Sequence, residues 1–286
     1  MKLLAAILLI LTSASACSRP TSHKHPQYVG STPVDRVVRD FLDITTKDSL
    51  DFIRWNLVIR ADSYDLDCQY GQSKGGTPGF IHEYKAGFSG SLRKEGNYYY
   101  LDYQGRTCAL AIINENLLQL LDENKNILAG NGGYSYTLSI DQPTKSDQFN
   151  LPTSHDPLPP VLVFEGRTRC AELSKAVGMG HTSECVKLKW YFIFYTDSTT
   201  GQPTYFLEGG RGYRRETMEK GKWEIAHGKD RRIIYKLKLQ NKPWSLYLLK
   251  GAENIWFFVD PEGNLLVGDE DFAYTLNRRK EEHPPL

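Results

Sequence analysis

The sequence lacks both a long apolar run and an excess of charge of either sign. Its longest apolar run, Leu3 to Leu11, has nine residues, whereas a membrane-spanning helix needs about 20. The 35 Lys and Arg residues balance 34 Asp and Glu residues, so the formal net charge is +1. A chain this close to neutral has no overall field that would attract nucleic acid or an anionic membrane. We therefore expect a soluble body without a nucleic-acid partner, whose contacts depend on local features.

The common catalytic motifs are missing as well. The chain contains no Gly-x-Ser-x-Gly, no His-Glu-x-x-His and no glycine-rich phosphate loop. Only 7 histidines occur, and His23, His25 and His283 lie near the chain ends. These absences favour a protein that is not an enzyme and needs no cofactor, although catalytic residues can also converge from distant strands.

The first 17 residues have the organisation of an export signal. A charged start precedes the apolar run, and the small residues at 14–16 lead directly to Cys17. This end is similar to a bacterial lipobox, whose cysteine becomes the acylated N-terminus, and several acyl chains would anchor the protein durably. An ordinary signal-peptidase site is the alternative. We expect residues 1–17 to be a lipoprotein signal peptide, with lipidation of Cys17 and anchoring at the outer membrane of a Gram-negative bacterium.

The number of cysteines supports lipidation. Five cysteines leave one unpaired in an exported chain unless that one is used elsewhere. With Cys17 acylated, Cys68 and Cys108 remain in the first half and Cys170 and Cys185 in the second, which predicts one disulfide per half in an oxidising envelope. Free buried thiols are the alternative, especially for the first pair, because Cys108 lies in an apolar, strand-like run.

One segment also contains a set of soft metal ligands. Cys170, Met179, His181 and Cys185 lie within 16 residues of irregular-looking sequence, and thiolate with thioether is the ligand set that Cu(I) prefers. A disulfide between the two cysteines would remove both thiolates. A metal site is therefore the alternative to a disulfide-closed loop, and it would require the reduced form.

The chain divides into two halves joined by a proline-rich stretch. Turn formers without apolar periodicity after Cys17 indicate a flexible tether, and helical spacing from Val34, with Thr32 as N-cap, predicts one short helix. Prolines around 160 exclude a sheet interior. The predicted parts are the tether 18–33, the first domain 34–140, the linker 141–160, the second domain 161–279 and the tail 280–286.

Both domains are predicted to be antiparallel and all-β, because apolar residues alternate with period two between short polar turns. The ending NILAGNGGYSYTL at 126–138 recurs as NLLVGDEDFAYTL at 264–276. A repeated closing strand suggests that each half curls until its last strand meets its first, which leaves no free edge. The predicted strands of the first half are Phe52–Arg60, Ser63–Tyr70, Asn97–Tyr103, Thr107–Ile113, Asn116–Leu121 and Tyr134–Ile140.

The lipobox-like start, the strand Trp55–Arg60, the aspartate-led turns and the terminal Tyr-Thr-Leu together resemble the N-terminal domain of NlpE-like lipoproteins. That family is linked to copper resistance and to sensing of envelope stress. The resemblance implies two tandem small lipocalin-like β-barrels with a short N-terminal helix. The family's Cys-x-x-Cys is incomplete here, because Leu173 follows Cys170 where the second cysteine is expected. Barrel architecture and envelope location therefore transfer more safely than a metal or redox role.

These observations predict a non-catalytic lipoprotein that acts in envelope homeostasis, stress or copper-related sensing through an envelope protein partner. One alternative is a carrier or receptor for a small apolar ligand, with Trp190, Trp223, Trp244 and Trp256 lining a barrel pocket. A narrow barrel usually fills with its own side chains, however. A basic stretch could also meet an acidic glycan or lipid headgroup; it comprises Arg211, Arg214, Arg215, Arg231 and Arg232.

Overall fold

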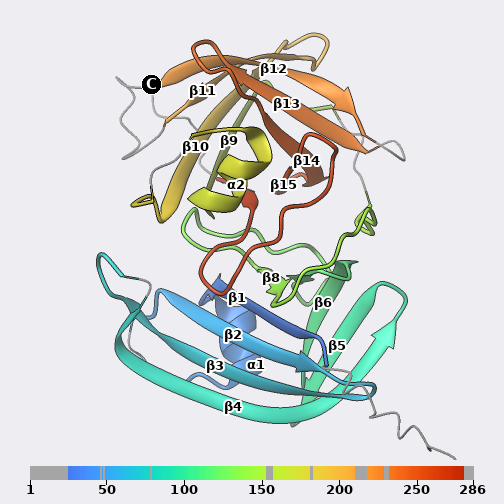
Figure 1. Cartoon of the computed structure of the whole chain (residues 1–286). Helices are drawn as coiled ribbons and strands as arrows, with labels where there is room; N and C mark the ends of the chain where they lie inside the picture. Colours follow the sequence, from blue (N-terminus) through green and yellow to red (C-terminus); the bar gives the residue numbers. More distant parts are fainter. Residues whose placement is uncertain are drawn as a thin grey trace, which may run out of the picture.

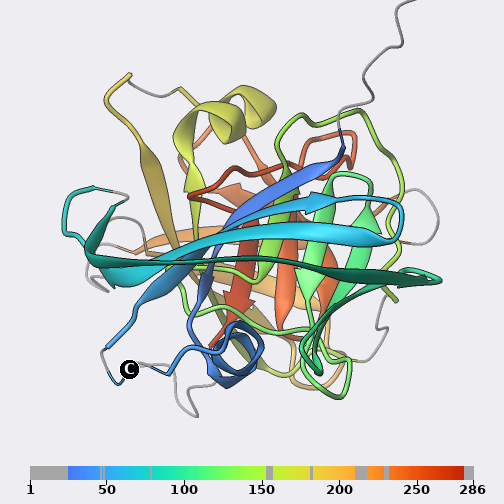
Figure 2. The same ribbon diagram turned by 90° about the horizontal axis from the view of Figure 1, so that it is seen from below.

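The computed structural model describes residues 25–279, except 46, 48, 78, 153–156, 181–182, 210–217 and 229–231. The described chain forms two closed antiparallel barrels in tandem, β1–β8 and β9–β16. Figures 1 and 2 show the barrels stacked on each other. The predicted all-β class and the pair of barrels are thus confirmed. Among the described residues, no helix has the length and apolar character needed to cross a membrane.

Each barrel has the same order of elements: one strand, one short helix, then seven strands. The first barrel comprises β1 (Gln27–Pro33), α1 (Arg36–Leu42), β2 (Phe52–Ile59), β3 (Ser63–Ser73), β4 (Phe80–Glu95), β5 (Tyr98–Tyr103), β6 (Arg106–Asn114), β7 (Leu117–Leu120) and β8 (Thr137–Ile140). The second comprises β9 (Val161–Arg169), α2 (Cys170–Val177), β10 (Lys187–Thr196), β11 (Pro203–Glu208), β12 (Glu219–His227), β13 (Ile233–Leu239), β14 (Leu246–Ala252), β15 (Ile255–Val259) and β16 (Thr275–Arg278).

The strand β1 corrects the predicted tether. Its residues pair with β2 along their whole length, and Tyr28 and Val29 also pair with β8. The first barrel therefore begins at Gln27, and only the part of the tether before it stays a prediction. The pattern was missed because the inward side chains of β1 include Gly30 and Thr32 beside Tyr28, so its apolar periodicity is weak.

The N-terminal helix forms, but it begins later than predicted. Asp35 is the N-cap, and its side chain accepts a hydrogen bond of 3.0 Å from the Val38 amide. Thr32 instead lies in β1, where its hydroxyl accepts a 2.9 Å hydrogen bond from Trp55 Nε1. The same bond joins Trp190 Nε1 to Thr168 in the second barrel, also at 2.9 Å. The two barrels thus repeat their interior contacts as well as their ending.

Several further elements were not predicted, among them β9, β11 and β12 of the second barrel, the helix α2 and the strand β4. The irregular-looking stretch after Arg169 begins with the helix α2, whose Leu173 and Val177 pack on the second core. The long strand β4 spans 16 residues, and its inward positions include Ala86 and Gly90 opposite β3. Small residues at inward positions remove the apolar alternation that identifies a strand.

The repeated ending closes each barrel against a glycine of its first strand. A Cβ on Gly30 would lie 2.9 Å from the Thr137 carbonyl oxygen, and one on Gly166 would lie 2.3 Å from that of Thr275. The tyrosine of each ending reaches the helix: Tyr274 donates to Glu172 at 3.2 Å. Burial, followed by the charge of Asp35 and a hydrogen bond to it, raises the pKa of the corresponding Tyr136. The repeat is thus explained by contacts that both barrels need.

The barrels also share a third apolar core between them. It contains equivalent side chains of both copies, 138 positions apart, and includes Ala111 with Leu249, Leu117 with Ile255 and Leu121 with Val259. Such reciprocal contacts are typical of the interface in a twofold dimer. Two hydrogen bonds between the barrels are equivalent in the same way. Gly130 N donates to Asn277 Oδ1 at 2.7 Å, and Gly268 N, 138 positions later, donates to Ser139 Oγ at 3.0 Å.

The predicted linker packs against this interface. Leu151 is buried in the shared core, and the ring of Phe149 lies 6.1 Å from that of Phe257. The Asn150 amide also donates to the Ile113 carbonyl at 2.9 Å. The described part of segment 141–160 therefore connects the barrels without separating them.

Candidate functional site

The loop between β15 and β16 crosses from the second barrel to the first. Its Glu270 carbonyl accepts a 2.6 Å hydrogen bond from Ser31 Oγ, and its Asp271 forms an ion pair of 2.5 Å with Arg54 on β2. Figure 1 shows this loop descending toward β1. Because Arg54 and Asp271 are both mostly buried, the contact fixes the loop at the junction of the barrels.

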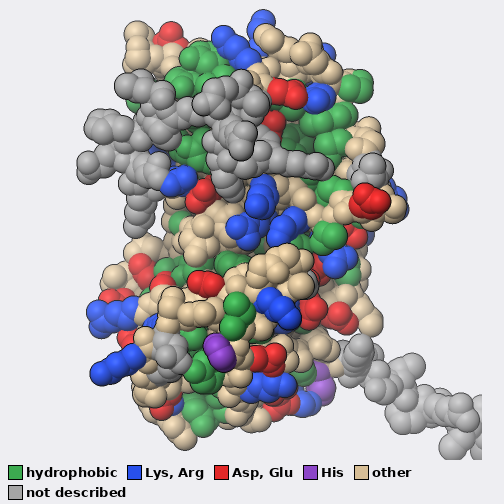
Figure 3. Space-filling model, turned by 90° about the vertical axis from the view of Figure 1, so that its left-hand side faces the viewer, with side chains coloured by type: hydrophobic (Ala, Val, Ile, Leu, Met, Phe, Trp, Pro, Cys, Tyr) green, Lys and Arg blue, Asp and Glu red, His purple; other side chains and the backbone are tan. Residues whose placement is uncertain are grey.

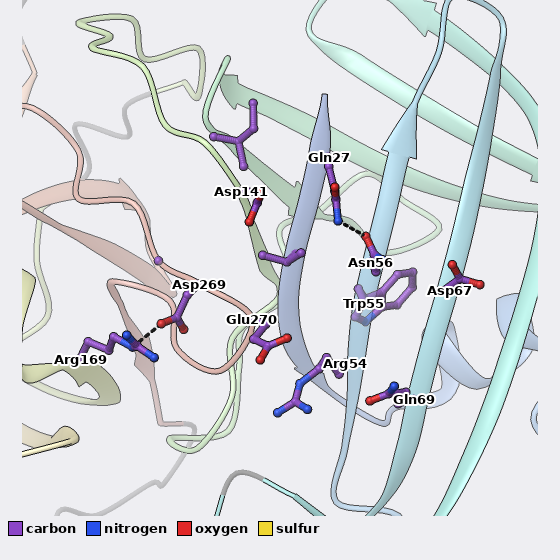
Figure 4. Close-up of a pocket in the computed structure, with 13 residues that line it drawn as sticks. Gln27, Arg54, Trp55, Asn56, Asp67, Gln69, Asp141, Arg169, Asp269 and Glu270 are labelled. Carbon is purple, nitrogen blue, oxygen red and sulfur yellow. Dashed lines mark hydrogen bonds and ion pairs between the residues drawn. The ribbon is translucent and has the colours of Figure 1, made fainter. Parts of the chain in front are cut away.

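A polar groove of about 470 Å³ lies beside this loop. Its floor is the outer face of β1, β2 and β3, where alternate residues point away from the barrel core. The loop between β15 and β16 forms the opposite wall, together with Arg169 from the end of β9 (Figure 4). The lining side chains that carry polar groups are Gln27, Arg54, Asn56, Asp67, Gln69, Asp141, Arg169, Asp269 and Glu270.

Several of these side chains hold each other in place. Gln27 Nε2 donates to Asn56 Oδ1 at 2.9 Å, and Arg169 forms an ion pair with Asp269 (Figure 4). Asp141 is positioned by its amide, which donates to the Gln27 carbonyl at 2.8 Å. Four lining carboxylates face two guanidinium groups, so the groove carries a formal charge of −2 and presents mainly hydrogen-bond acceptors.

The equivalent surface of the second barrel is filled. Tyr191 occupies the position of Asn56 in the repeat and is buried. The guanidinium of Arg279 lies 5.8 Å from its ring and 3.5 Å from Glu165 Oε2. A duplicated surface is therefore open and polar in one copy and closed in the other, which makes the groove a candidate site.

The disulfide predicted in the second half is confirmed. Cys170 and Cys185 are bonded, with their Cα atoms 5.9 Å apart, so neither sulfur is a thiolate ligand in this state. Met179 packs against the second core. His181 and Cys17 lie outside the described residues, so the complete copper set and the lipidation stay predictions.

The disulfide predicted in the first half is wrong. Cys68 on β3 and Cys108 on β6 are free and buried, and β4 and β5 lie between their strands in the barrel. Both side chains belong to the first core. Burial raises the pKa of Cys108 to about 12 and that of Cys68 well above its usual range. Packing, and not pairing, accounts for these two cysteines.

We expect both thiols to be unreactive toward a thiol reagent in the native protein at about pH 8, because the thiolate is the reactive form. Unfolding in denaturant without reductant should release the 2 free thiols. The experiment uses a protein of residues 18–286, so that Cys17 does not contribute to the thiol count. Unfolding with both denaturant and reductant gives the total number of thiols as the control. Release of no thiol on unfolding would show that Cys68 and Cys108 are bonded.

A half-buried carboxyl pair in the second barrel was also not predicted. Glu208 on β11 lies directly opposite Glu219 on β12, and Lys242 approaches Glu219 at 3.2 Å. Burial, followed by the charge of Glu219, raises the pKa of Glu208 to about 7. Sequence alternation could have located both residues on one face, but it could not show that the face is desolvated.

This carboxyl should make stability depend on pH. The folded state binds the Glu208 proton more tightly than the unfolded chain, so its stabilising contribution is complete below about pH 4.5 and is lost as the pH rises to about 7. Glu208→Gln should therefore raise the free energy of unfolding by about 1–3 kcal/mol at pH 8 and change it little at pH 4. Urea unfolding at both values measures this.

Glu224→Gln is the matched control for that experiment, because Glu224 is exposed on β12 and is 3.6 Å from Lys236. It should change stability by less than about 0.5 kcal/mol at either pH. Equal effects of Glu208→Gln at both pH values would contradict a raised pKa.

The interior of the second barrel is filled by aromatic rings. Trp256 lies 4.2 Å from Phe164 and 4.5 Å from Tyr235 between ring centroids, and Trp190 and Trp223 belong to the same core. Trp244 packs against its margin. Three of the tryptophans considered for a ligand pocket are therefore core residues, which weakens the carrier hypothesis for this barrel.

Comparison of the chain with protein-family models, with curated proteins and with solved structures finds no match. The likeness to NlpE-like lipoproteins therefore stays a prediction from the sequence. Any functional inference depends on the geometry of the described residues.

Proposed function

We propose that the protein is a non-catalytic binding protein of the cell envelope, anchored through Cys17, whose inter-barrel groove contacts an envelope protein partner. The observation that carries this proposal is the groove itself, which is open on the first barrel, whereas Tyr191 and Arg279 cover the equivalent described surface of the second. Sensing of envelope stress, including copper-related stress, is the role that the sequence resemblance suggests for such contacts.

The groove has the rigidity that a binding site needs. Its two walls come from different barrels, and these are joined by a buried apolar core and by the Arg54–Asp271 ion pair. Polar groups held in place before binding lose little conformational freedom when a ligand arrives. The groove is thus preorganised, although its residues are far apart in the sequence.

The lining also indicates the chemistry of the partner. Carboxylates of Asp67, Asp141 and Glu270 and the amide of Gln69 offer acceptors on both walls. A volume of about 470 Å³ is within the usual range of small-ligand sites and accommodates a few residues of a chain. A protein segment that presents Lys or Arg side chains and backbone N–H groups would complement this surface.

Site-specific photocrosslinking in intact producing cells tests the proposal. A photoreactive amino acid in place of Gln69, inside the groove, should yield a discrete adduct with another envelope protein. The same substitution at Lys238, exposed on β13, is the control and should not. Equal adducts from both positions, or none from Gln69, would contradict the groove as contact site.

Mass spectrometry of the mature protein tests the anchor separately. We expect the mass of acyl groups on Cys17, together with one internal disulfide. An unmodified Cys17 would refute lipid anchoring while leaving the groove proposal intact.

A further inference from the structure

Four cationic side chains stand together on the outer face of β9 and β10. The strand register places Arg167 opposite Lys189 and Arg169 opposite Lys187. Leu188, between the two lysines, packs against the second core, and Thr168, between the two arginines, is buried, so these four side chains point outward. Lys187, Lys189 and Arg169 are exposed and Arg167 is half-buried. We call the four residues the cationic ladder.

The fold does not require the ladder. Like charges directly opposite each other on neighbouring strands are destabilising. Burial, followed by the charges of Arg167 and Lys189, lowers the pKa of Lys187. Among the described residues, Arg169 is the ladder residue that forms an ion pair with a carboxylate, that of Asp269. Asp269 compensates only Arg169 by an ion pair among these contacts, and an anionic ligand would offset the remaining repulsion between the opposed cations.

The surroundings of the ladder favour an extended anionic surface. Figure 3 shows Lys and Arg side chains gathered at mid-height, where the two barrels meet. Val186, next to the ladder, is 66% exposed, and an apolar side chain beside cations is common where proteins lie on membranes.

We propose that the cationic ladder binds the phosphate groups of an anionic lipid surface. Exposed cations on an open strand can each meet a different headgroup, and each Lys or Arg near such a surface contributes on the order of 1 kcal/mol to binding. The contact would orient the body of the protein on the membrane, with the second barrel facing lipid. The ladder shares Arg169 with the groove, so its test uses Lys187 and Lys189, which do not line the groove, and it requires no acyl chain on Cys17.

Vesicle sedimentation tests this proposal with residues 18–286, which lack both the leader and Cys17. The protein should bind vesicles containing phosphatidylglycerol and should not bind vesicles of neutral phosphatidylcholine alone. Lys187→Glu with Lys189→Glu should reduce binding at low salt about tenfold or more. Because both side chains are exposed and lie among like charges, the double variant should fold normally, which near-ultraviolet circular dichroism checks.

The control is Lys222→Glu with Lys238→Glu. These exposed lysines also lie opposite each other, on β12 and β13, so the control changes the net charge equally. It should retain binding to within about threefold of the parent chain. Equal loss in both double variants, or no preference for anionic vesicles, would overturn the proposal. Inhibition by low concentrations of inorganic phosphate would also overturn it, in favour of a soluble phosphate ligand.

Discussion

Phe257→Ala is expected to lower the free energy of unfolding by about 3–5 kcal/mol, because the removed ring leaves a cavity that its neighbours fill only partly. Phe257 is 1% exposed and lies in the core shared by the two barrels. It projects outward from β15, so the substitution leaves the interior of the second barrel unchanged. Chemical denaturation followed by tryptophan fluorescence measures the loss.

The same variant tests whether the barrels stabilise each other. In the parent chain, burial of apolar surface between the barrels should couple their unfolding into a single transition, and weakening that contact should separate the transition into two. Lys222→Ala, at an exposed position of the same barrel, is the control and should change the midpoint little. An unchanged midpoint for Phe257→Ala would show that the shared core contributes no stability.

Replacing Cys170 and Cys185 together by Ser is expected to cost about 3 kcal/mol. The bond spans 15 positions in sequence and joins the first residue of α2 to the segment before β10. Without it, the unfolded chain gains freedom in this loop, and α2 loses a covalent connection to the barrel. The midpoint of denaturation measures the effect.

Reduction provides the matched control for that variant. Dithiothreitol should lower the stability of the parent chain to the level of the double variant and should leave the variant unchanged. If the double variant were as stable as the oxidised parent, the disulfide would have no role in stability. Because Cys68 and Cys108 are free, reduction should affect only the bond in the second half.

Contacts made locally along the chain were well predicted from sequence. The repeated Tyr-Thr-Leu indicated that both halves end in the same kind of strand, and β8 and β16 begin at Thr137 and Thr275. The aspartate-led turns form as expected: Asp122 and Asp260 each accept a 2.8 Å hydrogen bond from the amide of the asparagine four residues later. Turn chemistry and period-two alternation depend on near neighbours, which the sequence displays directly.

Features that depend on distant segments were predicted poorly. The first strand was predicted as tether because its inward positions Gly30 and Thr32 are not apolar. The barrel needs a small residue at Gly30, where the closing strand approaches, and the Thr32 hydroxyl accepts a hydrogen bond from Trp55. Cys68 and Cys108 were paired by counting, whereas the barrel places two strands between theirs. Counting cysteines specifies how many can pair, but only the fold specifies which sulfur atoms meet.

The sequence alone therefore established two repeated, strand-built halves, because periodicity and turn residues report local backbone structure. It did not show that Leu117 and Ile255 belong to one core, since an outward apolar residue looks the same whether a ligand, a partner or a second barrel covers it. The groove follows from that packing, because its walls are brought together only when the loop after β15 reaches Arg54. Tertiary structure decided the candidate site, as its polar side chains come from both barrels.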